Sequence, residues 1–279
     1  MEHGKESHEV QEIQLDILKN IIRICDENNI EYFIDSGTAL GAVRHKGFIP
    51  WDDDIDIGMK RSEYNRFLEA AQEKLGDDYF LQTFQTDNES PFYFAKIRKN
   101  GTKFVEMYCR DLDMHHGIYV DVFPYDQMAN NRFLRVWQAL CVNFFKNIYI
   151  SKCVKGSSIP QKNISGKLKL AARAILHILL KPVSKNVLFN ALDRAIQKFN
   201  NQEKTLVTNW SDKKGYWRSM DYDMIYPLRQ MQFEYLTVNA INRVDVWLEK
   251  AYGDYMTYPP KCERVGHRPV LLDTGSKIE

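Results

Sequence analysis

The apolar positions in residues 11–28 recur three and four residues apart along the chain. This spacing is typical of an amphipathic α-helix, because residues three and four apart lie on the same side of a helix. The positions are Ile17, Leu18, Ile21, Ile22 and Cys25. We therefore expect the chain to open with a helix whose apolar side packs against a core.

Two short apolar runs follow this helix and predict strands. Residues 32–34 form the first run, and Ile55 and Ile57 form a second run in which apolar residues alternate with carboxylates. Between the two runs, residues 39–43 are apolar and are suited to start a short helix.

The next segment repeats this mixture of helix and strand. Ser62 is placed to cap the N-terminus of a helix that runs to about Leu75. Further strands are predicted at 93–98, 103–107 and 118–123. Pro124 is expected to close the last of them, because proline cannot donate a ladder hydrogen bond. Short strands mixed with helices indicate an α/β or α+β fold.

From residue 127 onward the chain becomes strongly basic. No Asp or Glu occurs between Asp126 and Asp193, whereas the same stretch carries eleven Lys and Arg residues. These cations are Arg132, Arg135, Lys146, Lys152, Lys155, Lys162, Lys167, Lys169, Arg173, Lys181 and Lys185.

Apolar residues inside the basic stretch follow a helical period, and Pro182 is expected to end that helix. Its apolar side consists of Leu168, Ala171, Ala172, Ile175, Leu176 and Leu179. Two explanations are open. The helices could form a charged, solvated cover over the core. Alternatively, they could attach to an anionic membrane surface, near which each cation contributes about 1 kcal/mol; we favour this second explanation.

Composition and charge narrow the class of protein. The chain has 279 residues, of which 44% are hydrophobic and 27% charged, as in a soluble globular protein. Its net charge of +1 combines +11 in residues 127–192 with −10 in the rest of the chain. A neutral total argues against a nucleic-acid-binding protein, but it leaves an anionic membrane open as a partner.

The cysteines and the first residues of the chain indicate the cellular compartment. The five cysteines are far apart and form no C-x-x-C pair, so we expect them to be reduced. The first residues are polar and acidic, unlike a secretory leader, and no uninterrupted apolar run reaches the roughly 18 residues of a membrane span. We therefore expect a cytoplasmic protein that is peripheral at the inner face of the membrane if the basic stretch binds lipid.

Three aspartates near the second strand are candidates for a metal site. Asp52, Asp54 and Asp56 are spaced by two, so they share one face if the strand is regular, while Asp53 points away. Carboxylates this close repel each other, and a divalent cation that prefers oxygen ligands would compensate them. Mg²⁺ is the favoured ion, and Mn²⁺ is an alternative. An exposed, Asp-rich turn is the other interpretation.

The residues upstream favour the metal site. Gly37 lies between Ser36 and Thr38 at a strand-to-helix junction, where a glycine and a helix N-terminus admit a phosphate. Arg44 and Lys46 follow and can pair with phosphate oxygens. A small turn, a short helix and two strand aspartates are arranged in this way in the nucleotidyltransferase fold. We therefore expect a nucleotidyltransferase-like mixed sheet flanked by helices, with a basic helical insertion.

The block at 37–57 resembles the hallmark block of the LicD family almost without gaps. The similarity continues at residues 96–98, 102–106, 117–124 and 252–256, and at Pro259, Pro260, Arg264 and His267. The family resembles the nucleotidyltransferase superfamily in fold and transfers phospho-alcohols from a CDP-linked donor; fukutin-related proteins are more distant relatives. One departure is Tyr235, which follows Phe233 and Glu234 where family members often have glycine.

The resemblance implies roles for individual residues. Asp54, Asp56 and Asp121 would be the catalytic and metal-binding carboxylates. Asp121 would complete the metal site or take a proton from the attacking hydroxyl, unless it is a buried acid paired with a base. The substrate-binding residues would be Gly37, Thr38, Arg44, His45, Lys96, Arg98, Arg264 and His267. For Lys96 and Arg98, which share one strand face, a solvated edge strand is the alternative to phosphate binding.

The resemblance also implies a division of the chain and an activity. Residues 1–126 would form the catalytic core, 127–205 the basic insertion, and 206–279 a segment that completes the site. The expected enzyme is a Mg²⁺-dependent phosphotransferase that moves a phospho-alcohol, with CDP-choline as favoured donor, and releases CMP. The acceptor would be a hydroxyl of a cell-surface glycan or lipid-linked oligosaccharide, in teichoic acid, lipopolysaccharide or capsule. The alternatives are a nucleotidyltransferase that releases pyrophosphate and a non-catalytic membrane adaptor.

Overall fold

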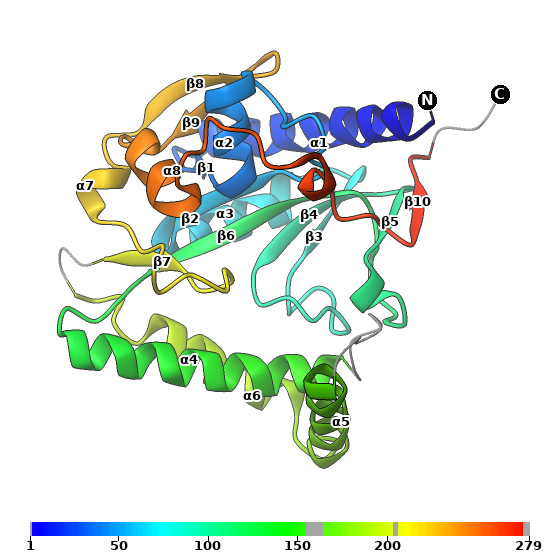
Figure 1. Cartoon of the computed structure of the whole chain (residues 1–279), viewed down its shortest axis with the longest axis vertical. Helices are drawn as coiled ribbons and strands as arrows, with labels where there is room; N and C mark the ends of the chain where they lie inside the picture. The colour runs from blue at the N-terminus through cyan, green and yellow to red at the C-terminus, as the bar shows by residue number, and fades with distance from the viewer. Residues whose placement is uncertain (1, 155–163, 203–205, 276–279) are drawn as a thin grey trace.

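A mixed six-stranded sheet forms the centre of the protein, in a computed structural model that describes residues 2–154, 164–202 and 206–275 (Figure 1). The strands are β1 (Phe33–Ile34), β2 (Asp56–Lys60), β3 (Tyr79–Gln82), β4 (Ala95–Lys99), β6 (Tyr119–Gln127) and β7 (Val207–Asn209). Their order is β1-β2-β6-β4-β3, and β7 also pairs with β6. Only the β2–β6 pair is parallel among these pairings. The predicted α+β class is therefore confirmed.

The central strand β6 is longer than the sequence predicts, because Pro124 does not close it. On one side Pro124 lies opposite Met59 of β2. On the other side, pairing with β4 ends at Val122 and pairing with β7 begins at Tyr125. Proline is tolerated in this gap because no neighbouring strand needs its missing N–H there.

Two helices, α1 (Glu2–Glu27) and α3 (Arg61–Lys74), contact the sheet through β2, β4 and β6. The apolar side predicted for α1 is buried, since Ile17, Leu18 and Ile21 are all 0% exposed. The predicted N-cap of α3 is wrong by two residues: the helix follows β2 directly at Arg61, and Lys60 caps it without a side-chain bond.

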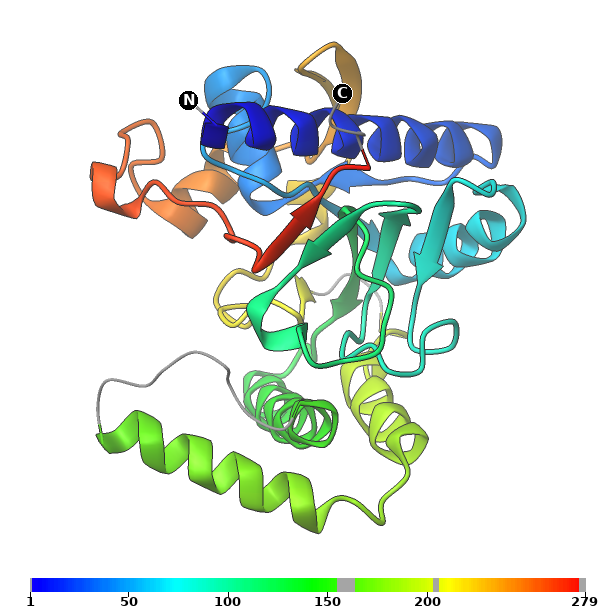
Figure 2. The ribbon, with the colours of Figure 1, turned by 90° about the vertical axis from the view of Figure 1, so that its right-hand side faces the viewer.

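The segments around the first strand bring distant parts of the chain together (Figures 1 and 2). Helix α2 (Ser36–His45) packs against β8 (Arg229–Phe233) and α8 (Val244–Tyr252). Strand β9 (Leu236–Ala240) forms a hairpin with β8 and contacts β1, and α7 (Tyr222–Ile225) precedes the hairpin. The C-terminal segment returns as β10 (Leu271–Asp273), which pairs with β5 (Lys103–Val105). Two single 3-10 turns lie at Met107–Cys109 and Lys261–Glu263.

The basic stretch folds into a helical layer at one end of the molecule, formed by α4 (Arg132–Cys153), α5 (Ile164–Leu179) and α6 (Lys185–Gln197) (Figures 1 and 2). The layer has its own buried cluster, which includes Val142, Tyr149, Leu192, Ile196 and Trp210. Two of the predicted cations, Lys155 and Lys162, lie outside the described residues. Within the described ranges, no helix has the length and apolar character needed to cross a membrane.

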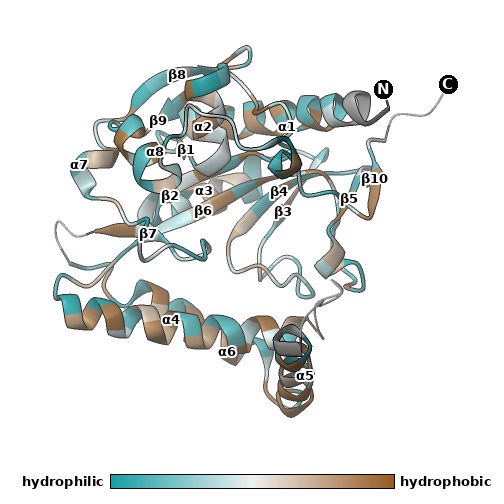
Figure 3. Cartoon of the chain, in the orientation of Figure 1, coloured by the Kyte–Doolittle hydropathy of each residue, from teal (hydrophilic) through white to brown (hydrophobic). Residues whose placement is uncertain are grey.

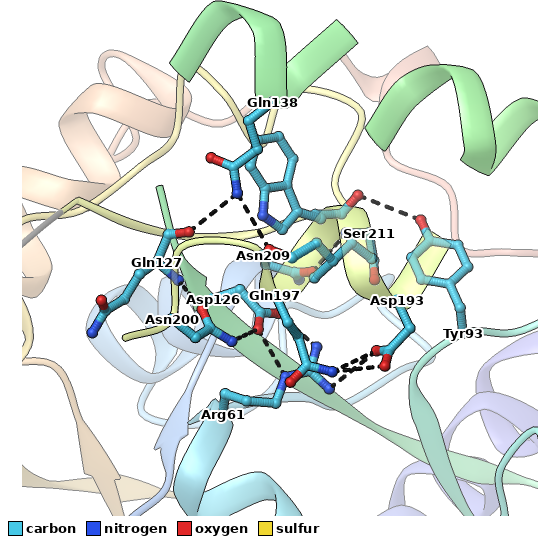
Figure 4. Close-up of polar contacts among 12 residues, drawn as sticks. Arg61, Tyr93, Asp126, Gln127, Gln138, Asp193, Gln197, Asn200, Asn209 and Ser211 are labelled. Atoms are coloured by element: carbon cyan, nitrogen blue, oxygen red, sulfur yellow. Dashed lines mark hydrogen bonds and ion pairs between the residues drawn. The ribbon is translucent and has the colours of Figure 1, made fainter. Parts of the chain in front are cut away.

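A polar network fastens this layer to the sheet (Figure 4). Arg61 at the start of α3 donates two hydrogen bonds to Asp126 of β6, at 2.8 and 2.6 Å. Asn200, just after α6, donates to the same carboxylate at 2.6 Å and accepts from the Gln127 backbone N–H at 2.8 Å. Gln138 of α4 donates to the Gln127 carbonyl at 3.2 Å. The helical layer is thus joined to the strand that carries Asp121.

Candidate active site

Three neighbouring strands place charged side chains in a row across the sheet. Asp56 begins β2 and lies opposite Asp121 of β6, and Asp121 in turn lies opposite Lys96 of β4. The Lys96 ammonium is 2.7 Å from an Asp121 carboxylate oxygen, and both side chains are at most 10% exposed. The strand register therefore brings the predicted carboxylates together although 65 residues separate them in sequence.

The segment before β2 is irregular and is held by the first helix. The Gln11 side chain donates to the Asp52 carbonyl at 2.9 Å, and the Gln14 side chain donates to the Asp53 carbonyl at 2.7 Å. Asp52, Asp54 and Asp56 line one cavity, as the alternation predicts. Asp53 does not line this cavity, in line with the expectation, but strand geometry begins only at Asp56 and one Asp53 oxygen lies within 4.8 Å of an Asp54 oxygen.

The cavity has a volume of about 400 Å³ and lies at the N-terminus of α2. It is lined by Ser36, Gly37, Asp52, Asp54, Asp56, Phe94, Phe123, Asn209, Ser211, Asp212, Arg218, Tyr252 and His267. A Cβ on Gly37 would lie 2.8 Å from an Asp52 carboxylate oxygen, so a larger residue here would displace that carboxylate. Ser36 has φ +47°, a left-handed conformation that costs a non-glycine residue roughly 1–2 kcal/mol.

The positive charge near the aspartates of the cavity is too small to offset their burial and mutual repulsion, so their pKa values are raised. Burial and the neighbouring Asp54 raise the pKa of Asp52 to about 8. Burial also raises the pKa of Asp54, and burial together with surrounding carboxylates raises that of Asp56 well above its usual range. The pKa of Asp121 rises only to about 6, because Lys96 opposes the effect of burial. Each acid thus resists ionisation in the absence of a further cation.

His267 reaches this cluster from the C-terminal segment. Its Nδ1 lies 2.8 Å from an Asp53 oxygen and 3.7 Å from an Asp54 oxygen, and its backbone N–H donates to Asp53 at 2.9 Å. The hydrogen bond to Asp53 raises the pKa of His267 to about 9, so the imidazole is protonated near neutral pH. The structure thus brings His267 together with the predicted aspartates, and its role in substrate binding stays a prediction.

The residues present fit a divalent cation. Among the described residues, Asp53 and Asp54 each offer one carboxylate oxygen within 4.8 Å of the other and of His267 Nδ1, but the protonated imidazole is an ion-pair partner of these acids rather than a cation ligand. Asp52 and Asp56 add oxygens from the same cavity. A cluster of buried carboxylates with raised pKa values has the oxygen chemistry that Mg²⁺ and Mn²⁺ select. Lys96 already occupies one oxygen of Asp121, so only the second oxygen of this carboxylate is left for a cation.

Three of the predicted substrate-binding residues, Thr38, Lys96 and Arg98, are buried and do not line the cavity. The Thr38 hydroxyl accepts the Asp56 backbone N–H at 2.8 Å, so it positions a carboxylate. Arg98 is 0% exposed and donates to the Gln82 side chain and the Gly117 carbonyl, both at 2.6 Å. Lys96 is paired with Asp121. The solvated edge strand is also wrong, because β4 lies between β6 and β3.

The predicted phosphate ligands Arg44, His45 and Arg264 lie elsewhere, because Arg44 and His45 end α2 and the cavity lies at its start. Both guanidinium groups stack on the Tyr258 ring, Arg44 at 4.8 Å and Arg264 at 5.3 Å from its centre. The Tyr258 hydroxyl is 3.0 Å from His45 Nε2. Burial and the nearby Arg264 lower the pKa of Arg44. These cations form a separate group beside Trp51 rather than a wall of the cavity.

The sequence analysis missed Arg218, the arginine that lines the cavity. It pairs with Asp212 at 2.9 Å and donates to the Ala251 carbonyl at 3.2 Å. Only the aromatic residues around it, Tyr216 and Trp217, stand out in sequence, and they do not indicate a phosphate ligand. Asp35 was missed as well: it caps α2, and its carboxylate accepts the Tyr125 hydroxyl at 2.7 Å.

The mixed sheet with aspartates on the adjacent strands β2 and β6, beside the N-terminus of α2, agrees with the nucleotidyltransferase-like fold expected from the sequence. Residues 29–152 match the family described as LicD/FKTN/FKRP, nucleotidyltransferase domain. This segment is a LicD-family domain, and the resemblance noted in the sequence is confirmed.

Individual relatives extend the match beyond this domain. The chain is 28% identical over 262 residues to the lipopolysaccharide cholinephosphotransferase LicD of Haemophilus influenzae. This match covers 93% of this chain and 94% of that protein. A shorter match of 39 residues, 36% identical, links it to the human ribitol 5-phosphate transferase FKRP, over 14% of this chain and 8% of that protein. An uncharacterised protein of Rickettsia prowazekii is 51% identical over 47 residues, or 17% of this chain and 18% of that protein.

Proposed function

We propose that this protein is a phosphotransferase that moves a phospho-alcohol from a CDP-linked donor to a hydroxyl group of a cell-surface glycan and releases CMP. The observation that carries the proposal is the cluster of Asp52, Asp54 and Asp56 in one cavity at the N-terminus of α2. The near full-length similarity to a lipopolysaccharide cholinephosphotransferase supports choline as the favoured alcohol and a surface glycan as acceptor.

The chemistry is an in-line displacement at phosphorus. The acceptor oxygen forms a bond to the phosphorus that bears the alcohol, and the bond from that phosphorus to the oxygen bridging the two phosphates breaks. CMP leaves with this oxygen, and the proton of the attacking hydroxyl passes to a carboxylate. The product is a phosphodiester between alcohol and glycan.

We assign the binding of Mg²⁺, or of Mn²⁺ in its place, to Asp54 and Asp56, with Asp52 beside them. The ion supplies charge neutralisation for the donor diphosphate when bound. Its two positive charges would offset the mutual repulsion that raises the pKa values of these acids. The ion pair with Lys96 limits the rise in the pKa of Asp121 to about 6, so we assign Asp121 to complete the cation site or to accept the proton of the acceptor hydroxyl.

The protein's own residues bind and orient the donor. The first turn of α2 presents its positive end to an anion in the cavity at Gly37, whereas the Ser36 backbone N–H is donated to the Asp35 carboxylate at 2.8 Å. Arg218 and His267 are the cationic side chains among the lining residues, and we assign them to the donor phosphates. Arg218 thus takes the role that the sequence analysis gave to Arg98.

The test compares conservative variants of the carboxylates. Asp54→Asn and Asp56→Asn keep the side-chain volume but remove charge, so each should lower CMP release from CDP-choline about 1,000-fold. Asp77→Asn, at an exposed acid outside the cavity, is the matched control and should retain full activity. Circular dichroism and Mn²⁺ binding, measured for every variant, separate loss of the cation from loss of the fold. Full turnover by both variants would exclude this site.

A nucleotidyltransferase reaction is the second candidate, because the same fold attacks the α-phosphorus of a nucleoside triphosphate in other enzymes of this superfamily. CTP with a hydroxylated acceptor would then give pyrophosphate. Chromatography of the nucleotide products distinguishes the two reactions. A protein that turns over neither class of donor would support the non-catalytic membrane adaptor instead.

A further inference from the structure

The long helix α4 carries apolar side chains on two opposite sides. One side is buried in the helical layer through Gln138, Val142 and Tyr149. The other side exposes a stripe spaced three and four residues apart, in which Phe133 is 84% exposed and Trp137 58%. The stripe consists of Phe133, Trp137, Leu140 and Phe144. A globular protein seldom leaves such a stripe in water.

Helix α5 repeats this arrangement as the outermost element of the layer (Figure 2). It is fastened to the end of α4, where His177 Nδ1 lies 2.9 Å from the Ser151 carbonyl and Lys152 donates to the Leu180 carbonyl at 3.0 Å. Its exposed apolar side chains are Leu168, Ile175, Ile178 and Leu179, all at least 59% exposed. Figure 3 shows hydrophobic residues recurring along α4 and over much of α5.

The segment that carries these stripes has charge of one sign in its sequence, although Glu89, Asp111 and Asp113 from other segments line a cavity with its residues Lys152, Lys181 and Lys185. Residues 127–192 contain eleven Lys and Arg and no Asp or Glu. Lys167 and Lys169 flank the α5 stripe and are exposed. Because two copies of this surface would bring like charges together, the charge disfavours a symmetric dimer through it. The exposed tryptophan and phenylalanines equally disfavour a purely electrostatic partner such as nucleic acid.

We infer that the outer side of α4 and α5 docks on an anionic lipid bilayer, with the apolar stripes entering the interface and the lysines facing lipid phosphates. Basic residues beside an exposed aromatic stripe are the combination that holds an amphipathic helix on an anionic surface. The inference goes beyond the proposed function and does not depend on it.

Helix α4, which carries part of the docking surface, is hydrogen-bonded to a segment that leads into the cavity wall. Lys146 of α4 donates to the Trp210 carbonyl at 3.0 Å, and the next residues, Ser211 and Asp212, line the cavity. The Tyr93 hydroxyl donates to the same carbonyl at 3.4 Å (Figure 4). A chain docked through α4 would therefore hold its cavity wall near the lipid surface.

The test is co-sedimentation of the full chain with vesicles. Equal parts of phosphatidylglycerol and phosphatidylcholine should pellet the protein, whereas phosphatidylcholine alone should not. Salt that shortens the Debye length to about 3 Å should release it. The double variant Lys167→Gln and Lys169→Gln should bind more weakly by about five-fold for each charge removed. The double variant Trp137→Gln and Phe144→Gln should lower the affinity for these vesicles at least about ten-fold.

Matched controls keep the inference open to refutation. Tyr235→Gln removes an aromatic side chain that is 65% exposed on the β8–β9 hairpin, and Lys103→Gln removes an exposed cation on β5. Both should bind vesicles like the unchanged protein. Absence of binding to anionic vesicles, or unchanged binding by both double variants, would overturn the inference. So would a stable dimer in sedimentation equilibrium that Trp137→Gln and Phe144→Gln dissociate, because a second copy would then cover the surface.

Discussion

Lys96 shows how a single residue can belong to the site without touching a substrate. Its ammonium lies 2.7 Å from an Asp121 oxygen and 3.4 Å from the centre of the Tyr119 ring, and its side chain is 2% exposed. Taking an ammonium and a carboxylate out of water is costly, and only their pairing and the ring contact offset that cost. Lys96 is therefore a positioning residue for a carboxylate of the site.

Replacing Lys96 alone should be strongly destabilising. In Lys96→Met the buried Asp121 carboxylate loses its partner, so we expect the free energy of unfolding to fall by about 3–5 kcal/mol. The double variant Lys96→Met and Asp121→Asn removes both charges and should recover at least half of that loss. Urea denaturation measures all three proteins. Equal stability of the single and double variants would contradict the assigned ion pair.

Asp35 gives a pH dependence with a defined sign. Burial raises its pKa from 3.8 to about 6, so the fold favours the protonated acid. This group therefore removes stability as pH rises from about 4 to about 6, by about 3 kcal/mol for two pKa units. Asp35→Asn cannot ionise, and its stability relative to the unchanged protein should rise over that window. A difference that stays constant with pH in denaturation experiments would refute the raised pKa.

The arginines show why residue roles are only partly readable from sequence. The spacing of two residues identifies Asp52, Asp54 and Asp56 as one group, because carboxylates that bind the same cation can come from neighbouring positions in the sequence. The two arginines differ in where the fold places them. Arg98 is fully buried within the sheet, whereas Arg218 lines the cavity. Local spacing carries no information on that difference, since strand order decides which strand lies at an edge.

Helix α2 is the element on which the site depends most closely, because its first residues line the cavity. Its close approach to the loop at 47–49 requires Gly41, where a Cβ would lie 2.4 Å from the Gly47 carbonyl oxygen. The helix is also held at its end, since Glu234 accepts the Phe48 backbone N–H at 2.9 Å. The glycine inside this helix is thus a packing requirement.

Gly41→Ala separates packing from helix propensity. Alanine is favoured over glycine in a helix by about 1 kcal/mol, so propensity alone predicts stabilisation. The clash with backbone at Gly47 predicts the opposite, a net loss of about 1 kcal/mol or more. Ser62→Ala at an exposed position of α3 is the control and should raise stability slightly. A higher midpoint of thermal unfolding for Gly41→Ala would contradict the close approach.

Elements with a strong local pattern were predictable, and those fixed by distant pairing were not. The amphipathic α1 and the apolar strand β6 follow directly from periodicity. Strand β10 is three residues long and exists because it pairs with β5, more than 160 residues earlier. The extension of β6 through Pro124 likewise depends on where β4 and β7 end.

At the scale of the whole molecule, charge is divided between two parts. The near-neutral total of +1 conceals −10 outside residues 127–192 and +11 within them. The acidic part carries the carboxylate cavity, and the basic part forms the helical layer. Sequence alone reveals this division, whereas the return of the C-terminal segment to place His267 against Asp53 depends on the complete fold.

The central claim is that the cavity transfers a phospho-alcohol and leaves CMP. The most direct measurement is chromatography of the nucleotide products after incubation of the full chain with a panel of CDP-alcohols, a glycan acceptor and Mg²⁺. The account predicts CMP in amounts equal to the phosphodiester formed, with CDP-choline as the best donor, and no product once a chelator removes the cation. Pyrophosphate from CTP with no CMP from any CDP-alcohol would contradict it.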